Sequence, residues 1–263
     1  LMHKAGVHGK AIIPMILGFG CNVPACLAAR IMDTWRERLL TIFMTTLIPC
    51  SAVTVVVMGL VGRYLGLGWV IGLYVFTLLM ALLIGSIASR ILPGEAIELI
   101  MEMPSYKIPN LKVILTMTWF RLKEYFYIAA PLIVVSGVVI KLLELSGILP
   151  MISITLAPIT VGWLRLPPET GVILLFGILR KELILAMLAS LTGTLDFSSV
   201  LSANQMITLS LITIFYIPCI ATISTLIRET GVRNALIITV FEISLAIILG
   251  GLASRLLILF GVA

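Results

Sequence analysis

The chain has 263 residues, of which 60% are hydrophobic and only 11% are charged, and its mean hydropathy is +1.20. Soluble domains carry about 25% charged residues, so this composition excludes a soluble globular protein and indicates an integral membrane protein. The apolar residues arrive in blocks of roughly 20, which predicts membrane-spanning helices rather than a barrel. The net charge of +6 is expected to reflect cytoplasmic loops and not nucleic-acid binding.

The first apolar segment, Ile12–Ala29, is long enough to cross a bilayer core but is interrupted by two glycines, a thiol, an amide and a proline. These residues are Gly18, Gly20, Cys21, Asn22 and Pro24. Because Pro24 has no N–H, the carbonyl of Gly20 loses its helical donor, and Val23 is expected to leave the helical conformation. Backbone freed at membrane depth is tolerated only within protein or beside a cavity, so the segment predicts a broken helix at a binding site.

Further apolar segments follow, several of them interrupted by proline or charge. In chain order they are Leu39–Val61 with Pro49 and Cys50 inside, Trp69–Ile91, Tyr125–Leu143, Pro150–Leu164, Gly171–Leu191 with Arg180–Glu182 inside, Gln205–Ile227 with Pro218 and Cys219 inside, and Ala235–Phe260. The polar stretch between the third and fourth segments contains Leu111–Lys123, which we expect to form an amphipathic helix on the membrane surface.

Positive charge orients these segments if each of them crosses the membrane once. The loops on one side would then hold Arg30, Arg36, Arg38, Arg90, Lys107, Lys112, Arg121, Lys123, Arg165, Arg228 and Arg233. The opposite loops after residue 30 would hold Arg63, Lys141 and Arg255. This imbalance predicts that the Arg30 side is cytoplasmic, and it leaves open whether Ile12–Ala29 crosses fully or re-enters.

An internal repeat is visible in the two proline-cysteine segments. Leu47–Ala52 resembles Tyr216–Ala221, and each follows an earlier segment that contains a Phe-Gly pair. Paired broken segments of this kind are typical of repeat-built transporters, whereas the alternative is coincidence between short apolar strings. The pattern predicts one transmembrane transport domain over residues 1–263, with similar halves at about 1–110 and 125–263.

Three cysteines share a context that favours metal binding. Cys21, Cys50 and Cys219 each lie in an apolar segment, near a proline that frees a backbone carbonyl. Free thiols are expected because a disulfide framework would lie in exposed loops. Thiolate and carbonyl ligands together suit a transition-metal ion that must bind and leave, although a buried cysteine can also serve as a small hydrophobe. Cys26 would face about 140° away from Cys21 on a continuous helix, so we assign it to packing.

Acidic residues inside apolar segments provide a second signal. Glu182 follows Arg180 and Lys181, and an intramembrane acid is a functional candidate by default. It could bind a metal, accept a proton or pair with Lys181; the alternative is a helix end whose side chains reach the cytoplasmic interface. Glu242 is a second buried acid, and Asn22 is a ligand or a cap. Packing is the default role of the four methionines that are weak ligand candidates, Met15, Met44, Met58 and Met187.

No part of the chain is expected to bind a nucleotide. Gly6–Ala11 has the spacing GxxGK, whereas a phosphate loop needs GxxxxGK followed by Ser or Thr and preceded by a strand.

Several strings match a known family in the order in which that family carries them. They are Gly9–Lys10, Pro14, Gly18–Ala25, Arg36–Thr41, Pro49–Ala52, Glu102–Pro109, Lys181–Glu182, Tyr216–Thr222 and Arg228–Gly231. Covering most of the chain, they resemble the membrane domain of the FeoB family of prokaryotic ferrous-iron transporters. The chain departs from that family at Val53–Thr54, where a basic residue followed by Leu-Pro is usual.

The resemblance implies an all-α, polytopic transmembrane helical bundle with two Gate-type broken-helix repeats, around Cys21 and Glu182. It implies a multi-pass protein of the cytoplasmic (inner) membrane that transports Fe²⁺ and is not an enzyme. The pore thiols would be Cys21, Cys50 and Cys219, and Asn22 and Glu182 would supply oxygen. The gating hinges are expected at Gly18, Gly20, Pro24, Pro49 and Pro218.

The resemblance also implies partners. The family's GTP-binding domain has no counterpart in this sequence, so GTP control is expected from elsewhere in a longer protein or from a separate protein. A small cytoplasmic accessory protein, membrane lipid and a homo-oligomer are the other partners, and no nucleic acid is expected. The alternatives are a Gate-type carrier of nucleosides or of another divalent metal, and a membrane scaffold. A metal path predicts converging cysteines, with Cys50 and Cys219 at similar depth, whereas a nucleoside site predicts converging amides and aromatics.

Overall fold

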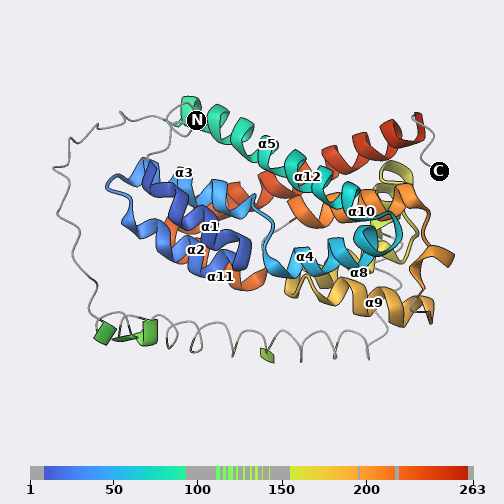
Figure 1. Cartoon of the computed structure of the whole chain (residues 1–263), viewed down its shortest axis with the longest axis horizontal. Helices are drawn as coiled ribbons and strands as arrows, with labels where there is room; N and C mark the ends of the chain where they lie inside the picture. The colour runs from blue at the N-terminus through green and yellow to red at the C-terminus, as the bar shows by residue number, and fades with distance from the viewer. Residues whose placement is uncertain are drawn as a thin grey trace.

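The computed structural model describes residues 9–92, 155–194, 196–216 and 219–259, together with scattered positions between 111 and 142. Every regular element in this part of the chain is a helix, and the helices gather into a bundle (Figure 1). The all-α prediction is therefore confirmed. Pro218, the string Glu102–Pro109 and the boundary between the expected halves lie outside the described residues, and the predicted surface helix Leu111–Lys123 is described only at isolated positions.

Two groups of helices follow the same order along the chain: two short helices joined by a break, two more joined by a break, and one long helix. The first group is α1 (Ile12–Gly20), α2 (Asn22–Ala28), α3 (Trp35–Thr46), α4 (Ser51–Val57) and α5 (Leu67–Ile91), with the short turns η2 (Gly9–Ala11), η3 (Ala29–Ile31) and η4 (Met58–Gly62). The second group is α8 (Thr170–Leu179), α9 (Leu183–Thr192), α10 (Ala203–Phe215), α11 (Ile220–Thr230) and α12 (Val232–Leu259), with η5 (Pro158–Trp163) and η6 (Phe197–Ser199).

Helices α1 and α2 form a hairpin that enters and leaves at the same end of the bundle. They lie side by side in Figure 1, and the Lys10 ammonium at the start of α1 is 2.7 Å from the Asp33 carboxylate just beyond α2. Ala11 and Met32 belong to the same buried cluster at that end. At about 1.5 Å per residue, neither helix can cross a bilayer core of about 30 Å. The first apolar segment therefore re-enters, with Cys21 at its tip.

The break in this hairpin lies three residues before the proline. Cys21 has extended backbone angles (φ −153°, ψ 132°), and α2 begins at Asn22 and includes both Val23 and Pro24. The prediction that Val23 leaves the helix is wrong, because Pro24 occupies the first turn of α2, where an N–H would have no intrahelical acceptor in any case.

The second hairpin, α8 and α9, breaks at Arg180 (φ −151°, ψ 117°). It starts beside the Arg165 carbonyl, which accepts a 3.0 Å hydrogen bond from the Gln205 amide at the beginning of α10. Glu229 near the end of α11 pairs instead with Arg30, just beyond the first hairpin. Since the broken span Ala203–Thr230 runs from one of these contacts to the other, the two hairpins enter the bundle from opposite ends.

This arrangement corrects the predicted position of Arg165. The guanidinium of Arg255 lies 3.9 Å from the centre of the Trp163 ring, so Arg165 shares the end of Arg255 and not that of Arg30. The prediction assumed that every apolar segment crosses the membrane once. Because α8 and α9 re-enter instead, the loops before and after this hairpin lie on the same side of the membrane. Among the described residues, positive charge still accumulates at one end, on Lys10, Arg30, Arg36, Arg38, Arg90, Arg228 and Arg233, against Arg63, Arg165 and Arg255 at the other.

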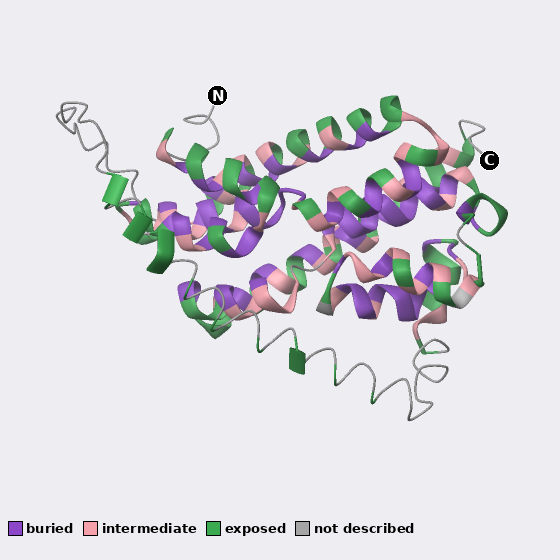
Figure 2. Ribbon diagram, turned by 60° about the horizontal axis from the view of Figure 1, so that its bottom comes forward, coloured by how far each residue is buried: buried purple, intermediate pink, exposed green. Residues whose placement is uncertain are grey.

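Four described segments are long and apolar enough to cross a membrane: Trp35–Gly62, Leu67–Ile91, Ala203–Thr230 and Val232–Leu259. The two broken spans are mostly buried, whereas α5 and α12 bury only a third of their most apolar window. Figure 2 shows how each long helix has one buried and one exposed face. The exposed apolar faces of α5 and α12 are suited to contact with lipid.

Glycines begin both long helices. Gly66 precedes α5 with φ 97°, and Gly231 precedes α12 with φ 83°. Residues with a Cβ rarely adopt these angles, so glycine allows a sharp reversal from each broken span into the following helix.

Candidate functional site

A cavity of about 250 Å³ lies where the breaks of both hairpins and both broken spans meet. The tip of the first hairpin contributes Cys21, and the tip of the second contributes Lys181 and Glu182. Cys50 begins α4 and Cys219 begins α11, each at the break of its span. The remaining lining residues are Gly20, Asn22, Val23, Ser51, Ala52, Arg180, Ile220, Ala221 and Thr222.

All the residues predicted to bind metal line this one cavity: Cys21, Cys50, Cys219, Glu182 and Asn22. The three cysteines are free thiols and are partly buried. Among the described residues, no three side chains of His, Cys, Asp or Glu come close enough to hold one ion together. The predicted donors thus surround a common space without converging on a single point, and their role as ligands stays a prediction.

Backbone carbonyls that lose their helical donor at the breaks accept hydrogen bonds from other groups. The Gly20 carbonyl ends α1, where the break at Cys21 leaves it without a helical donor, and it accepts a 2.8 Å hydrogen bond from the Ser51 hydroxyl. The Thr45 carbonyl, freed by Pro49, accepts a 3.2 Å bond from the N–H of Ile48 in a tight turn. Ser51 therefore ties the tip of the first hairpin to the neighbouring broken span.

The charges at the second hairpin tip do not form the Lys181–Glu182 pair, which was one of the alternatives that the sequence left open. Glu182 pairs with Arg180 at 2.9 Å, and both side chains are partly exposed. Lys181 is buried, and its ammonium donates a 3.1 Å hydrogen bond to the Thr213 carbonyl in the last turn of α10. Carbonyls in the last turn of a helix lack intrahelical donors, so Lys181 closes the end of α10.

Cys26 lies behind the cavity in a packed apolar layer. It is fully buried in a cluster with Ile42, Leu226 and Ile238, which agrees with its assignment to packing. The four candidate methionines do not line the cavity either.

The expected hinges differ in their surroundings. Gly18 is buried, and a Cβ there would lie 3.3 Å from the Thr45 side chain, so this glycine allows α1 to approach α3 closely. Gly20 faces open space, Pro24 lies inside α2, and Pro49 lies in the break between α3 and α4. Their movement stays a prediction.

The sequence analysis did not identify three polar residues that line the cavity, Ser51, Lys181 and Thr222. In particular, it did not predict that Lys181 binds a backbone carbonyl. The Thr222 hydroxyl lies 3.3 Å from the Cys219 sulfur. A usable signal was present for Ser51 and Thr222, since each follows a proline-cysteine break by only a few residues. Lys181 gave no such signal, because its acceptor lies 32 residues away along the chain.

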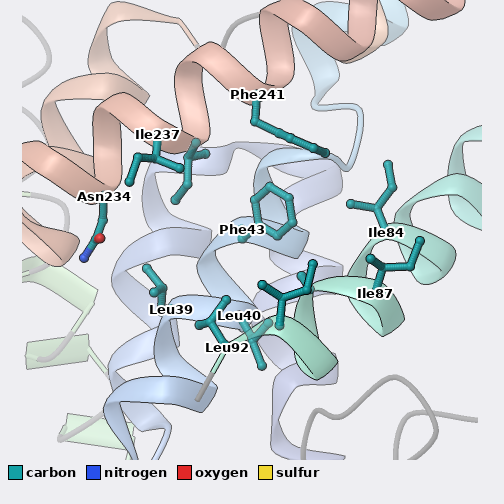
Figure 3. A pocket seen from close by; sticks show the side chains of 12 residues that line it. Leu39, Leu40, Phe43, Ile84, Ile87, Leu92, Asn234, Ile237 and Phe241 are labelled. Carbon is teal, nitrogen blue, oxygen red and sulfur yellow. The ribbon is translucent and has the colours of Figure 1, made fainter. Parts of the chain in front are cut away.

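A second hollow, of about 380 Å³, lies between α3, α5 and α12 (Figure 3). Its lining is aliphatic and aromatic, and the rings of Phe43 and Phe241 meet edge to face with centroids 5.4 Å apart. Asn234 is the polar residue of the lining, and its amide donates to the Thr230 carbonyl at 2.8 Å. This groove offers no thiol or carboxylate to a cation.

Comparison with known proteins identifies the family. A family model described as "Nucleoside recognition" (Gate) matches residues 1–64 and 126–233, and one described as "Ferrous iron transport protein B C terminus" matches residues 70–121. The Fe(2+) transporter FeoB of Methanocaldococcus jannaschii is 32% identical over 281 residues, which cover 94% of this chain and 41% of that protein. The chain belongs to the FeoB family.

Other FeoB relatives are similar over shorter alignments. The Fe(2+) transporter FeoB of Staphylococcus aureus (strain COL) is 32% identical over 88% of this chain and 38% of its own length. That of Salmonella typhimurium (strain LT2) is 37% identical over 52% of this chain and 18% of its own length. The chain spans about two fifths of the length of the first two relatives. No solved structure is significantly similar to it.

The Gate match follows the architecture of this FeoB chain. Its first part, residues 1–64, includes the first hairpin and the first broken span, and its second part, residues 126–233, includes the second hairpin and the second broken span. Most of the long helix α5 falls in the match to the FeoB C terminus, which begins at residue 70. The cavity is therefore built from Gate segments on all sides.

Proposed function

We propose that this FeoB chain carries Fe²⁺ across the membrane through the cavity between its two hairpin tips. The relatives are named as Fe(2+) transporters, and the observation that carries the proposal is that Cys21, Cys50, Cys219 and Glu182 line one cavity. Thiols and a carboxylate together favour a transition-metal ion over Mg²⁺ and Ca²⁺, which prefer oxygen ligands alone.

The loose arrangement of the donors supports transport rather than storage. Conduction requires a site that binds strongly enough for the ion to enter and weakly enough for it to leave. Because three ligating side chains do not meet at one point among the described residues, an ion in the cavity would keep water or backbone oxygen in part of its coordination shell. Such an ion exchanges more readily than one held in a closed cysteine site.

The distribution of charge supports an orientation. The end of the bundle that carries Arg30, Arg36 and Arg228 is richer in Arg and Lys, and we assign it to the cytoplasmic side of the cell's inner membrane. Fe²⁺ would then leave the cavity between α2, α3, α11 and α12, which continue from the cavity toward that end.

The lining argues against a nucleoside as the cargo. A nucleoside site is expected to combine amides with aromatic rings that stack on the base. The described lining holds one amide, that of Asn22, together with three thiols and no aromatic ring. The Gate match therefore reflects a shared arrangement of helices. The side chains that line the cavity in this chain favour a metal ion as the cargo.

Uptake by vesicles reconstituted with the purified chain tests this proposal. Fe²⁺ under reducing, anaerobic conditions, Mn²⁺, Zn²⁺ and uridine are compared at equal protein content, with protein-free vesicles as the baseline. We expect Fe²⁺ to enter faster than Mn²⁺ and uridine to stay at the baseline. Uridine uptake without Fe²⁺ uptake would overturn the proposal, as would baseline uptake of all four solutes.

A further inference from the structure

A buried carboxylate behind the cavity has no role in the site described above. Glu242, in α12, is 1% exposed, and its Oε1 atom has no hydrogen-bond partner. The Thr46 side chain of α3 lies beside its carboxyl, and the Thr46 hydroxyl donates a 2.8 Å hydrogen bond to the Phe43 carbonyl. Asn22, at the start of α2, is 5% exposed, and its Oδ1 atom is also unpartnered. A buried oxygen without a donor costs free energy, so two of them in one region need a reason.

The helices around Glu242 are arranged in layers. Cys26 of α2, Ile42 of α3, Leu226 of α11 and Ile238 of α12 belong to one buried cluster, the apolar layer below the cavity. In each of these helices the residue four positions nearer to the cavity is polar. These residues are Asn22, Thr46, Thr222 and Glu242, and each is at most 5% exposed.

The geometry of a helix brings these four polar residues together. Residues four apart lie on the same face and about 6 Å apart along the axis. Four helices that meet at the apolar layer therefore meet again one turn higher, at the polar residues. Two observations agree with this placement: Asn22 and Thr222 both line the cavity, and the Thr46 side chain lies beside the Glu242 carboxyl.

The donor set of this polar layer is made of oxygen. It offers one carboxylate, one amide carbonyl and two hydroxyls, which suit a divalent cation and lack the thiols of the cavity above. The buried ammonium of Lys181 is bound to the Thr213 carbonyl and makes no hydrogen bond to Glu242 Oε1. The carboxyl group of Glu242 thus keeps a free oxygen for a ligand.

We propose that Glu242, Asn22, Thr46 and Thr222 form a second cation site on the Arg30 side of the cavity, where Asn22 and Thr222 already belong to the lining. An ion that leaves the thiols meets oxygen ligands next, and these hold Fe²⁺ less tightly than thiolates do. The identity of the cargo rests on the function proposed above, but the presence of the site does not.

Binding of Mn²⁺ to the purified full chain tests this site, because Mn²⁺ accepts oxygen ligands and its free form gives an electron paramagnetic resonance signal. We expect Glu242→Gln, which keeps the shape and removes the charge, to raise the Kd of Mn²⁺ by at least about tenfold. Thr46→Val, which replaces the hydroxyl with a methyl group, should raise the Kd by a smaller factor. It also provides a test if the Glu242 variant does not fold.

Matched controls separate the site from general effects on the bundle. Thr41→Val makes the same change at a buried, unpartnered hydroxyl on α3, one position before Ile42 and therefore turned about 100° from this layer. Glu169→Gln removes an exposed negative charge at the start of α8. Both controls should bind Mn²⁺ as the unmodified chain does.

The outcomes distinguish the two proposals. If Glu242→Gln and Thr46→Val bind Mn²⁺ as tightly as the controls, the second site is overturned, whether or not the unmodified chain takes up Fe²⁺. If binding depends on Glu242 while the unmodified chain takes up no Fe²⁺, the site stands and the proposed function fails.

Discussion

The hydroxyl of Ser51 donates a 2.8 Å hydrogen bond to the carbonyl of Gly20. That carbonyl ends α1, where the break at Cys21 leaves it without a helical donor, and the donor that replaces it belongs to the first residue of α4. The break therefore does more than interrupt a helix, because it leaves an acceptor through which the hairpin tip attaches to the broken span beside Cys50.

Replacing Ser51 with alanine should loosen this attachment. We expect Ser51→Ala to lower stability by about 1 kcal/mol, since one net hydrogen bond is lost and water in the cavity can reach the carbonyl. Thermal unfolding in detergent measures the change. Ser51→Thr, which keeps a hydroxyl, should restore most of the stability. Ser244→Ala, which removes an exposed hydroxyl of α12 that is bonded within its own helix, should leave the transition unchanged. Equal stability of all four proteins would show that the bond contributes nothing.

The buried Glu229 should hold the Arg30 end of the bundle closed. Its carboxylate pairs with both Arg30 and Arg38, although its own side chain is only 2% exposed. Glu229→Gln should destabilise this end by about 2 kcal/mol, because charge-assisted hydrogen bonds are lost. If the loss is expressed as local opening, Cys26, which lies one layer deeper, should react with a thiol reagent up to roughly 30-fold faster.

The rate of alkylation in a chain that keeps only Cys26 measures this opening. Arg228→Gln is the matched control, since Arg228 is exposed on the same turn of α11. An unchanged labelling rate in the Glu229 variant would mean that the ionic cluster does not guard the apolar layer.

Glu182 should matter for transport and hardly at all for stability. Its ion pair with Arg180 joins two side chains that are 38% and 46% exposed, so its loss should change stability by less than about 1 kcal/mol. We expect Glu182→Gln to slow Fe²⁺ uptake several-fold, because one charged oxygen donor leaves the cavity. Glu169→Gln removes a charge outside the cavity and should keep both properties. A Glu182 variant with normal uptake would remove this carboxylate from the path.

The sequence predicted the chemistry of the cavity better than the path of the chain through it. Cys21, Cys50, Cys219, Asn22 and Glu182 were found because thiols, amides and acids are conspicuous in apolar segments, and all five line the cavity. Helix breaks were predicted because proline acts locally on the backbone of its own segment.

Tertiary packing decided the points that the sequence left open or gave wrongly. The contact between Lys10 and Asp33 shows that the first segment re-enters, and no local pattern distinguishes this from a crossing. The error at Arg165 followed from the same ambiguity in α8 and α9. The break at Cys21 instead of Val23 reflects the tolerance of the first helical turn for proline, which is a local rule that was applied at the wrong position.

The central claim, that Fe²⁺ passes the thiols of the cavity, is tested most directly by the initial rate of Fe²⁺ uptake into reconstituted vesicles by two cysteine variants. Because a thiol must lose its proton to bind metal, uptake by the unmodified chain should also weaken as the external solution is acidified. Cys21 lines the cavity, whereas Cys26 is fully buried in the apolar layer. At equal amounts of inserted protein, we predict that Cys21→Ser lowers the rate by at least about tenfold, while Cys26→Ser keeps a rate close to that of the unmodified chain. Equal rates for the two variants would contradict the account and return Cys21 to a packing role.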